Sequence, residues 1–260
     1  MQYQVKLVDI AEEFSLEQIS LPENIDEIYV RRSDVSRPGL PLAGYFEYFE
    51  NGRIQMIGNM EHGYLSSLGA EARFKALDDY LSHDVVAVVV TTSLDIFPEL
   101  YTLVQKHDTP LYRTTWPTSE FMAALISSLS VSLAERITRH GVLVEVYGEG
   151  ILMLGDSGIG KSETAIELIK RGHRLVADDA VEIKRIGATL VGTAPELIRN
   201  YLEVRGVGVI DVEKLFGVGS VQDSTQIDLV IQFEKWADDK FYDRLGLDEN
   251  DTTILDVPVP

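Results

Sequence analysis

Eight consecutive residues, 155–162, have the types and spacing of a phosphate-binding loop. They read Gly-Asp-Ser-Gly-Ile-Gly-Lys-Ser and satisfy the pattern G-x-x-x-x-G-K-[ST]. Glycine allows such a loop to turn its backbone N–H groups onto an anion, the lysine can reach the terminal phosphates, and the serine hydroxyl can bind Mg²⁺. The sequence therefore predicts a nucleotide site formed by Gly155, Asp156, Ser157, Gly158, Ile159, Gly160, Lys161 and Ser162.

The segments on either side of the loop provide the elements that such a loop needs. Residues 151–154 are apolar and predict a buried strand, and residues 161–171 carry Ala165, Leu168 and Ile169 at helical spacing. Gly172 follows as a typical C-terminal stop of a helix. Strand, loop and helix in this order place a helix N-terminus under the phosphates.

Two adjacent carboxylates, Asp178 and Asp179, follow the next apolar segment, and transfer of phosphate needs both a metal and a group that manages the acceptor. Neighbouring residues of a strand project to opposite faces, so the two acids can divide these tasks. We favour Asp179 as the base that takes a proton from an attacking hydroxyl, and Asp178 as the metal-side or supporting acid. The reverse assignment is also compatible with the sequence.

Residues 203–212 combine charged residues, glycines and β-branched residues, a composition that weakens a plain strand. Close approach of a substrate to the backbone would explain the glycines, with Glu203 as a second metal ligand and Arg205 as a phosphate contact. A structural bulge explains them equally well. His140, before Gly141, has a default explanation as a histidine at a helix C-terminus, and Arg244 has one as a surface arginine.

The chain as a whole has an α/β pattern, and we predict two domains. Residues 1–130 form a small N-terminal α/β domain, with helical spacing over 70–81 and strand character over 84–92, and residues 131–260 form a phosphate-loop kinase domain. A helix that begins near Pro117 is expected to run to about His140 and to bridge the two domains. Residues 142–147 and the strand before the loop are expected to form a β-hairpin that opens the second domain.

Composition limits the classes of function. The 260 residues are 45% apolar, and the longest aliphatic run has six residues, far fewer than the roughly 20 that span a bilayer. The net charge of −19 argues against a nucleic-acid partner, because such binding depends on neutralisation of phosphates by Lys and Arg. No signal segment opens the chain and there is no cysteine, so we expect a cytoplasmic protein without membrane contact.

Several of these segments resemble bifunctional HPr kinase/phosphorylases, the HPr serine kinase family. The resemblance covers nearly the whole chain and is carried by residues 36–39, 42–46, 53–55, 140–144, 155–163, 171–179 and 203–212. The pairing of Gly-Lys-Ser-Glu-Thr with Arg-Gly-His-Arg-Leu-Val-Ala-Asp-Asp is highly specific to that family.

The resemblance implies a protein kinase that uses ATP, or pyrophosphate, to phosphorylate a serine of HPr, a carrier protein of the sugar phosphotransferase system. It also implies removal of that phosphate by inorganic phosphate, which yields pyrophosphate. The family's fold has a mixed sheet like that of phosphoenolpyruvate carboxykinase, and its members are homohexamers that control carbon catabolite repression. By resemblance, His140, Lys161, Asp179 and Arg244 are catalytic, and Ser162 and Glu203 bind Mg²⁺.

One departure from the family concerns the end of the sequence. Family members continue beyond the position of Pro260 with a basic Arg-Pro-Gly-Arg loop and a final helix, which the family links to the phosphorylase reaction and to contacts with HPr and between subunits. We therefore expect a chain that is truncated or naturally short, in which dephosphorylation and the hexamer are the activities most affected.

Two other functions are compatible with the phosphate loop. The first is a kinase of small metabolites, which the extra domain ahead of the loop and the Asp178-Asp179 pair fit less well. The second is a nucleotide-sensing module that binds ATP without transferring phosphate. The aspartate pair argues against a sensor, because a sensor needs no base.

Overall fold

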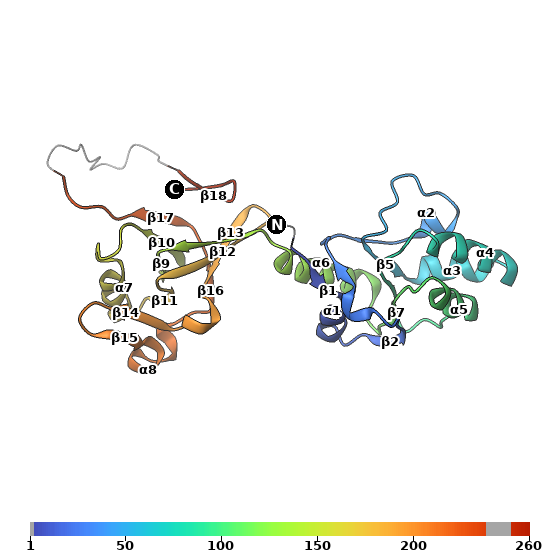
Figure 1. The fold of residues 1–260 in the computed structure, drawn as a ribbon, viewed down its shortest axis with the longest axis horizontal. Coiled ribbons are helices and arrows are strands. Elements are labelled where there is room, and N and C mark those ends of the chain that lie inside the picture. Colours follow the sequence, from blue (N-terminus) through green and yellow to red (C-terminus); the bar gives the residue numbers. More distant parts are fainter. Residues whose placement is uncertain (1–2, 238–250) are drawn as a thin grey trace. The chain divides into compact units, whose positions relative to one another are not determined.

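The computed structural model describes residues 3–237 and 251–260, and the chain divides into two units, Met1–Leu133 and Ala134–Pro260 (Figure 1). Each unit has hydrophobic clusters of its own. The mixed α/β class predicted from the sequence is confirmed, because helices cover β-sheets in the structure. Arg244 lies outside the described residues.

The first unit is built on a five-stranded sheet in the order β2-β7-β6-β5-β4. Its strands are β2 (Glu17–Ser20), β4 (Val35–Ser36), β5 (Ile54–Ile57), β6 (Val88–Val90) and β7 (Leu111–Arg113). Strands β4 to β7 are parallel, and β2 is antiparallel to β7. Both faces of the sheet are covered, since Met56 of β5 points into one core and the adjacent Ile57 points into the other.

Helices cover both faces of this sheet. The helices α1 (Leu7–Glu13) and α6 (Thr118–Ser132) pack on one face, and α3 (Asn59–Ser67), α4 (Ala70–Leu81) and α5 (Pro98–Lys106) pack on the other, next to the short α2 (Gly39–Leu42). A short antiparallel pair, β1 (Val5–Lys6) and β3 (Tyr29–Val30), and the 3-10 turn η1 (Ile25–Glu27) complete the unit. The helix predicted over 70–81 is confirmed, whereas the strand predicted over 84–92 is shorter and covers only β6.

The prediction that one helix runs from Pro117 to about His140 is wrong. The helix α6 ends at Ser132, and its buried residues Phe121, Leu125 and Leu129 belong to the core of the first unit, so it does not bridge the two units. Residues that follow it form the strand β8 (Arg136–His140), which pairs antiparallel with β12 (Ala180–Ile186). Helical spacing continues through Leu133, but strand pairing with a distant segment decides the conformation after it.

The second unit contains two sheets that pack face to face. The first has the order β11-β9-β10-β17, with β9 (Val142–Val146), β10 (Glu149–Leu154), β11 (Arg174–Ala177) and β17 (Leu229–Gln232). It is mixed, because β10 pairs antiparallel with β9 and parallel with β17. The second sheet is antiparallel, in the order β16-β13-β12-β8, with β13 (Thr189–Thr193) and β16 (Ser224–Gln226).

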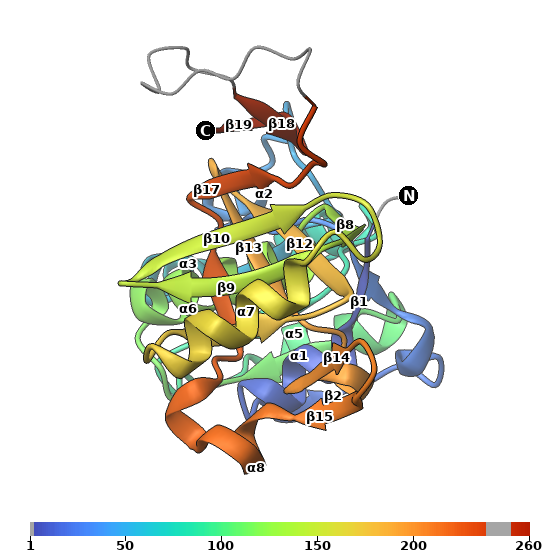
Figure 2. The same cartoon turned by 90° about the vertical axis from the view of Figure 1, so that its left-hand side faces the viewer.

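The first of these two sheets is the middle layer of the unit. Leu143 of β9 points into the core between the sheets, whereas its neighbours Val142 and Val144 point to the opposite face. There they meet the helix α7 (Lys161–Lys170) and a hairpin of β14 (Tyr201–Val204) and β15 (Gly208–Asp211) (Figure 2). The predicted β-hairpin that opens the second domain is confirmed by β9 and β10, and the predicted strand-loop-helix order is confirmed by β10 and α7.

Short elements complete the second unit. They are the helix α8 (Val212–Phe216), the 3-10 turns η2 (Glu196–Ile198) and η3 (Val218–Ser220), and the hairpin of β18 (Thr252–Ile254) and β19 (Val257–Val259). Ile254 and Val259 of the last hairpin reach the core between the two sheets.

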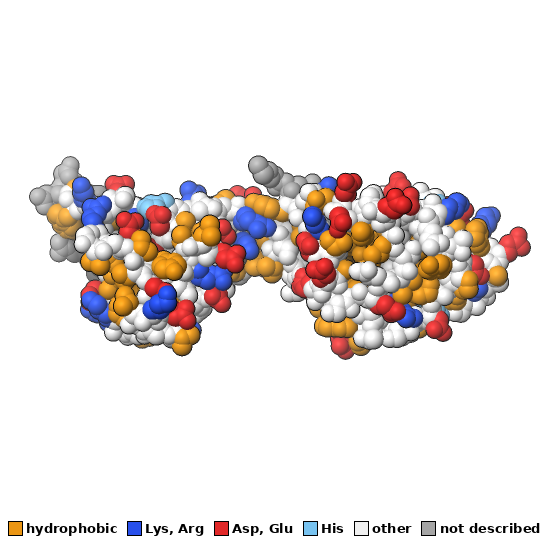
Figure 3. All heavy atoms as spheres, turned by 60° about the horizontal axis from the view of Figure 1, so that its bottom comes forward, with side chains coloured by type: hydrophobic (Ala, Val, Ile, Leu, Met, Phe, Trp, Pro, Cys, Tyr) orange, Lys and Arg blue, Asp and Glu red, His pale blue; other side chains and the backbone are white. Residues whose placement is uncertain are grey.

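The surface carries charges of both signs. On the face drawn in Figure 3, acidic and basic side chains are interspersed, with apolar side chains between them. Within residues 3–237 and 251–260, the helices are too short or too polar to cross a bilayer.

Gly150 of β10 lies directly against the main chain of β16, and this contact generates a prediction of stability. A Cβ atom at this position would lie 1.8 Å from the main-chain oxygen of Gln226. We expect Gly150→Ala to lower the free energy of unfolding by about 1–3 kcal/mol, because the backbone of β16 must move. Urea unfolding of the full chain measures the change. Gly219→Ala is the control, since among the described residues no atom beyond the adjoining ones in the chain lies within 4 Å of the added methyl group; equal effects of the two variants would contradict this account.

Candidate active site

The loop of residues 155–162 connects β10 to α7 and places the N-terminus of that helix beneath it. Gly155, Gly158 and Gly160 have φ values of +141°, +77° and +111°, a region that side-chain-bearing residues rarely adopt. Thr164 closes the first turn of α7, with its N–H and its hydroxyl both donating to the Gly160 carbonyl. The glycines therefore make possible the sharp change from strand to loop to helix.

Lys161 is held inside this loop. Its side chain is only 6% exposed, and its ammonium group donates to the Gly155 carbonyl at 2.8 Å and to the Asp156 carbonyl at 3.0 Å. Because the buried charge is satisfied by these main-chain oxygens, the lysine is preorganised at the mouth of the loop.

Asp178 and Asp179 do not lie in a strand, contrary to the prediction from the sequence. The strand β11 ends at Ala177, so neither acid lies in it. Asp179 has a φ of +68°, and the Ala180 N–H donates to the Asp178 carbonyl at 2.9 Å. This tight turn, rather than the alternation of a strand, separates the surroundings of the two acids while leaving both beside the phosphate loop.

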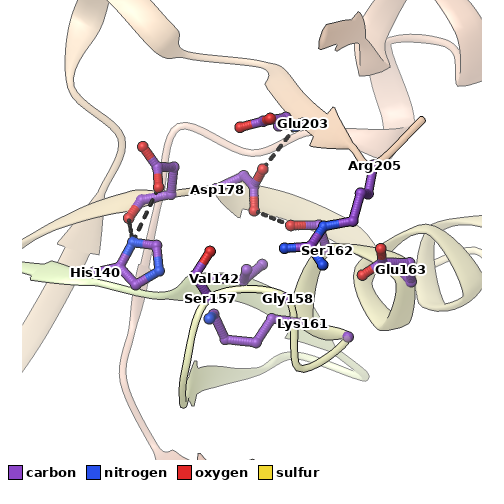
Figure 4. Close-up of a pocket in the computed structure, with 12 residues that line it drawn as sticks. His140, Val142, Ser157, Gly158, Lys161, Ser162, Glu163, Asp178, Glu203 and Arg205 are labelled. Atoms are coloured by element: carbon purple, nitrogen blue, oxygen red, sulfur yellow. Dashed lines mark hydrogen bonds and ion pairs between the residues drawn. The ribbon is translucent and has the colours of Figure 1, made fainter. Parts of the chain in front are cut away.

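Asp178 links three parts of the chain. Its side chain is 5% exposed; Oδ1 accepts a hydrogen bond of 2.9 Å from the Ser162 hydroxyl, and Oδ2 accepts one of 2.9 Å from the Glu203 main-chain N–H (Figure 4). Burial raises the pKa of the Asp178 carboxyl, and these hydrogen bonds oppose that effect. Asp178 thus ties the first turn of α7 to the hairpin of β14 and β15.

Asp179 is paired with His140. Nδ1 of His140 lies 2.9 Å from the Asp179 carbonyl oxygen and 3.0 Å from its carboxylate Oδ1. Both neighbours are acceptors, so Nδ1 carries the hydrogen and donates it. The two side chains are 52% and 68% exposed, which leaves the Asp179 carboxylate accessible to an incoming group. His140 is at the end of a strand, so the helix-dipole explanation of this histidine is wrong.

The hairpin of β14 and β15 explains the glycines of residues 203–212. Gly206 and Gly208 have φ values of +80° and +106° at the turn, which the hydrogen bond from Val207 N–H to the Val204 carbonyl closes. The turn accounts for both glycines without a substrate. On the hairpin, Glu203 and Arg205 line the same cavity as the phosphate loop, and the Arg205 side chain extends toward that loop (Figure 4).

A cavity of about 90 Å³ lies between these elements. It is lined by His140, Val142, Ser157, Gly158, Gly160, Lys161, Ser162, Glu163, Asp178, Asp179, Glu203 and Arg205. The predicted site residues Gly155, Asp156 and Ile159 belong to the loop but do not line the cavity. No cluster of three or more His, Asp or Glu side chains suited to a metal occurs among residues 3–237 and 251–260.

Family models match almost the entire chain. Residues 5–129 match the model of the HPr Serine kinase N terminus, and residues 131–260 match that of the HPr Serine kinase C-terminal domain. The chain belongs to the HPr serine kinase family.

Relatives in this family are similar over most of their length. The chain is 48% identical over 257 residues to the HPr kinase/phosphorylase of Caldanaerobacter subterraneus subsp. tengcongensis, which covers 98% of this chain and 84% of that protein. It is 47% identical over 248 residues to that of Lachnoclostridium phytofermentans, with coverage of 95% and 80%. A solved structure, the HPr(Ser) kinase/phosphatase from Coxiella burnetii, is 35% identical and matches 48% of this chain and 82% of that chain, with a TM-score of 0.45.

Two residues that line the cavity, Glu163 and Val142, were not predicted from the sequence of this member of the HPr serine kinase family. Glu163 follows Ser162 in the first turn of α7, and its place directly after the loop motif is the signal that would have found it. Val142 lies in β9, and nothing in its local sequence distinguishes it from other core valines. Its position at the cavity results from strand pairing.

The buried carboxyl of Asp178 generates a prediction about pH. The pKa of the Asp178 carboxyl in the folded state lies above the unfolded value of about 3.9, so the ionised carboxyl lowers the stability of the fold. This loss of stability is complete at pH values above the folded-state pKa and absent at pH values below the unfolded-state pKa. Each unit of difference corresponds to about 1.4 kcal/mol. We therefore expect Asp178→Asn, which can still accept the Glu203 N–H, to be more stable than the native chain near neutral pH, with an advantage that shrinks as the pH falls toward about 4.

Urea unfolding of the native chain and of Asp178→Asn, from neutral pH down to about pH 4, measures the difference in their free energies of unfolding. Asp223→Asn is the control, because Asp223 is 85% exposed. A stability difference for Asp178→Asn that is independent of pH would contradict the assigned cause.

Proposed function

We propose that the chain transfers the terminal phosphoryl group of ATP to a serine of HPr, and that it removes the group from phosphoserine by phosphorolysis. The observation that carries the proposal is the cavity in which a phosphate loop, a buried metal-side acid and an accessible carboxylate meet. Relatives that match this chain over most of their length are HPr kinase/phosphorylases.

The loop binds the phosphates of the donor. Its eight residues, 155–162, supply main-chain N–H groups, and Lys161 supplies a positive charge close to them. When a nucleotide enters, the ammonium group exchanges carbonyl oxygens for phosphate oxygens, which are stronger acceptors because they are charged.

The residues beside the loop fit Mg²⁺. The Ser162 hydroxyl and the Asp178 carboxylate are hard oxygen ligands that are hydrogen-bonded to each other, and Glu203 lines the same cavity. Mg²⁺ prefers one or two carboxylates together with substrate phosphates and water, so the small donor set is sufficient. Ser162 and Glu203, with Asp178 at their side, would hold the ion, which when bound would neutralise charge on the phosphates.

Asp179 handles the proton in both directions. In the kinase direction it accepts the proton of the serine hydroxyl while the serine oxygen forms its bond to phosphorus and the bond to the leaving diphosphate breaks. In the reverse direction an oxygen of inorganic phosphate forms a bond to the same phosphorus, the phosphorus–serine bond breaks, and Asp179 returns the proton to the serine oxygen. The products are then serine and pyrophosphate.

His140 orients the Asp179 carboxylate through its Nδ1–H, and Arg244 is the remaining member of the proposed catalytic set. Catalysis is assigned to residues 131–260. The similarity to phosphoenolpyruvate carboxykinase, the homohexamer, the role in carbon catabolite repression and the cytoplasmic location stay predictions.

The direct test is incubation with purified HPr, Mg²⁺ and ATP, with mass spectrometry to locate any added phosphate. We expect a single phosphoserine on HPr and a loss of about 10²–10³ in kcat/KM for Lys161→Ala, which removes the charge at the loop. Lys170→Ala is the matched control, because this lysine lies at the other end of α7 and pairs with Glu167. Phosphorylation of free metabolites in place of HPr, or nucleotide binding without any transfer, would contradict the proposal.

A second test concerns the shared proton carrier. Asp179→Asn is expected to lower the rate of HPr phosphorylation and of phosphoserine phosphorolysis alike, by about 10²–10⁴. Asp256→Asn is the control, since Asp256 is 90% exposed. If Asp179→Asn abolishes only the kinase reaction, one carboxylate does not serve both directions.

A further inference from the structure

Arg205 makes an unusually close contact with the phosphate loop. Its guanidinium group lies against Gly158, where a Cβ atom would be 2.2 Å from Nη2 and 2.5 Å from Nη1. In Figure 4 the side chain extends from the hairpin toward Gly158 and Ser162. No side chain other than hydrogen fits at position 158 while the guanidinium is in this place.

The N–H groups of the Arg205 guanidinium are available to a ligand at this position. Lys161 uses its ammonium group to bond two loop carbonyls, whereas in the part of the chain that the structure describes Arg205 forms no hydrogen bond or ion pair. A guanidinium presents a planar fork of N–H groups that matches phosphate oxygens. Arg205 is thus a phosphate-type donor that the loop itself does not supply.

The cavity favours a phosphate group over any other part of a nucleotide. Its volume of about 90 Å³ is below the roughly 300–1,000 Å³ of pockets that enclose whole small molecules. Val142 is the one large apolar side chain among the lining residues, and Phe, Tyr and Trp, on which a base could stack, are absent from this lining. Asp179, the proposed proton acceptor, lines the same cavity, so a phosphate held there is the one under attack.

The charges in the cavity favour a second protein cation beside the phosphate. Glu163, Asp178, Asp179 and Glu203 bring four carboxylates to its lining, against Lys161 and Arg205. A phosphate with several negative charges is repelled by these carboxylates, so both cations facing it would add to the neutralisation that a bound Mg²⁺ would supply. The hairpin keeps Arg205 in position, because its strand β14 is tied to Asp178 through the Glu203 N–H and buries Leu202 in the core.

We propose that Arg205 binds the transferred phosphoryl group, which is the γ-phosphate of ATP in one direction and the phosphate of phosphoserine in the other, and that position 158 must be glycine in order to admit its guanidinium. This inference rests on the proposed function, since it assumes that the cavity holds the transferred group. It gives Gly158 a role beyond loop conformation, which its φ of +77° alone would explain.

The test compares the affinities of the full chain for ATP and ADP in the presence of Mg²⁺. We expect Arg205→Gln to weaken binding of ATP about 10- to 100-fold and to leave the affinity for ADP unchanged, because ADP lacks the contacted group. Arg205→Lys retains the charge but not the planar fork of N–H groups, so its affinity for ATP should lie between those of the native chain and of Arg205→Gln. Arg199→Gln is the matched control, an exposed arginine of the same unit whose nearest acid is Asp223.

Gly158→Ala tests the second half of the proposal. The added methyl group should displace the guanidinium and reduce the preference for ATP over ADP, and combining it with Arg205→Gln should add little to the effect of Arg205→Gln alone. Fully additive effects of the two substitutions would show that Gly158 acts independently of Arg205.

The outcomes separate this inference from the proposed function. If the native chain phosphorylates HPr and Arg205→Gln keeps the native ratio of ATP to ADP affinity, the role of Arg205 is wrong and the proposed function stands. Equal weakening of ATP and ADP would also overturn the inference. If the native chain neither binds ATP nor phosphorylates HPr, the proposed function fails first.

Discussion

The geometry of the site depends on one buried carboxylate. Asp178 accepts a hydrogen bond from Ser162 on α7 and another from the main chain of Glu203 on β14, and these two elements are separate in the sequence. An ionised carboxyl at this depth is costly, and the two hydrogen bonds offset part of the cost. Without it, the loop and the hairpin would keep a core contact through Leu202 but would lose the two hydrogen bonds that join them through Asp178.

The same interaction organises the charges around the loop. Acids outnumber cations in the cavity lining, and Asp178 stands next to a second aspartate that raises its pKa further. Such a site is unfavourable until a phosphate and a divalent ion enter it. A perturbed acid in a polar cavity is typical of functional sites, where the cost of assembling charges is recovered when the ligand binds.

The layers of the second unit explain why these groups converge. The middle sheet has α7 and the β14–β15 hairpin on one face, and β8 brings His140 to the turn that holds Asp179. The loop connects β10 to α7, the aspartate turn connects β11 to β12, and the end of β8 leads into β9. Precise placement of side chains on connections is possible because the strands and α7 beneath them are rigid.

The local sequence determined those features of the fold that depend only on neighbouring residues in the chain. A glycine-rich pattern permits the positive φ values of a tight loop, a helix at 161–170 follows from apolar spacing, and an aspartate pair after a buried strand must come to the strand's end. Each of these was predictable, as were the hairpin of β9 and β10 and the mixed α/β class.

Only the tertiary structure decided what depends on pairing between distant segments. Residues 136–140 form a strand because β12 is available as a partner, and nothing within that segment distinguishes it from the end of a helix. The same pairing brings His140 to Asp179, and packing of the hairpin against α7 brings Arg205 to Gly158. A sequence states which residues can do chemistry, whereas the distances between them are set by long-range packing that no local pattern encodes.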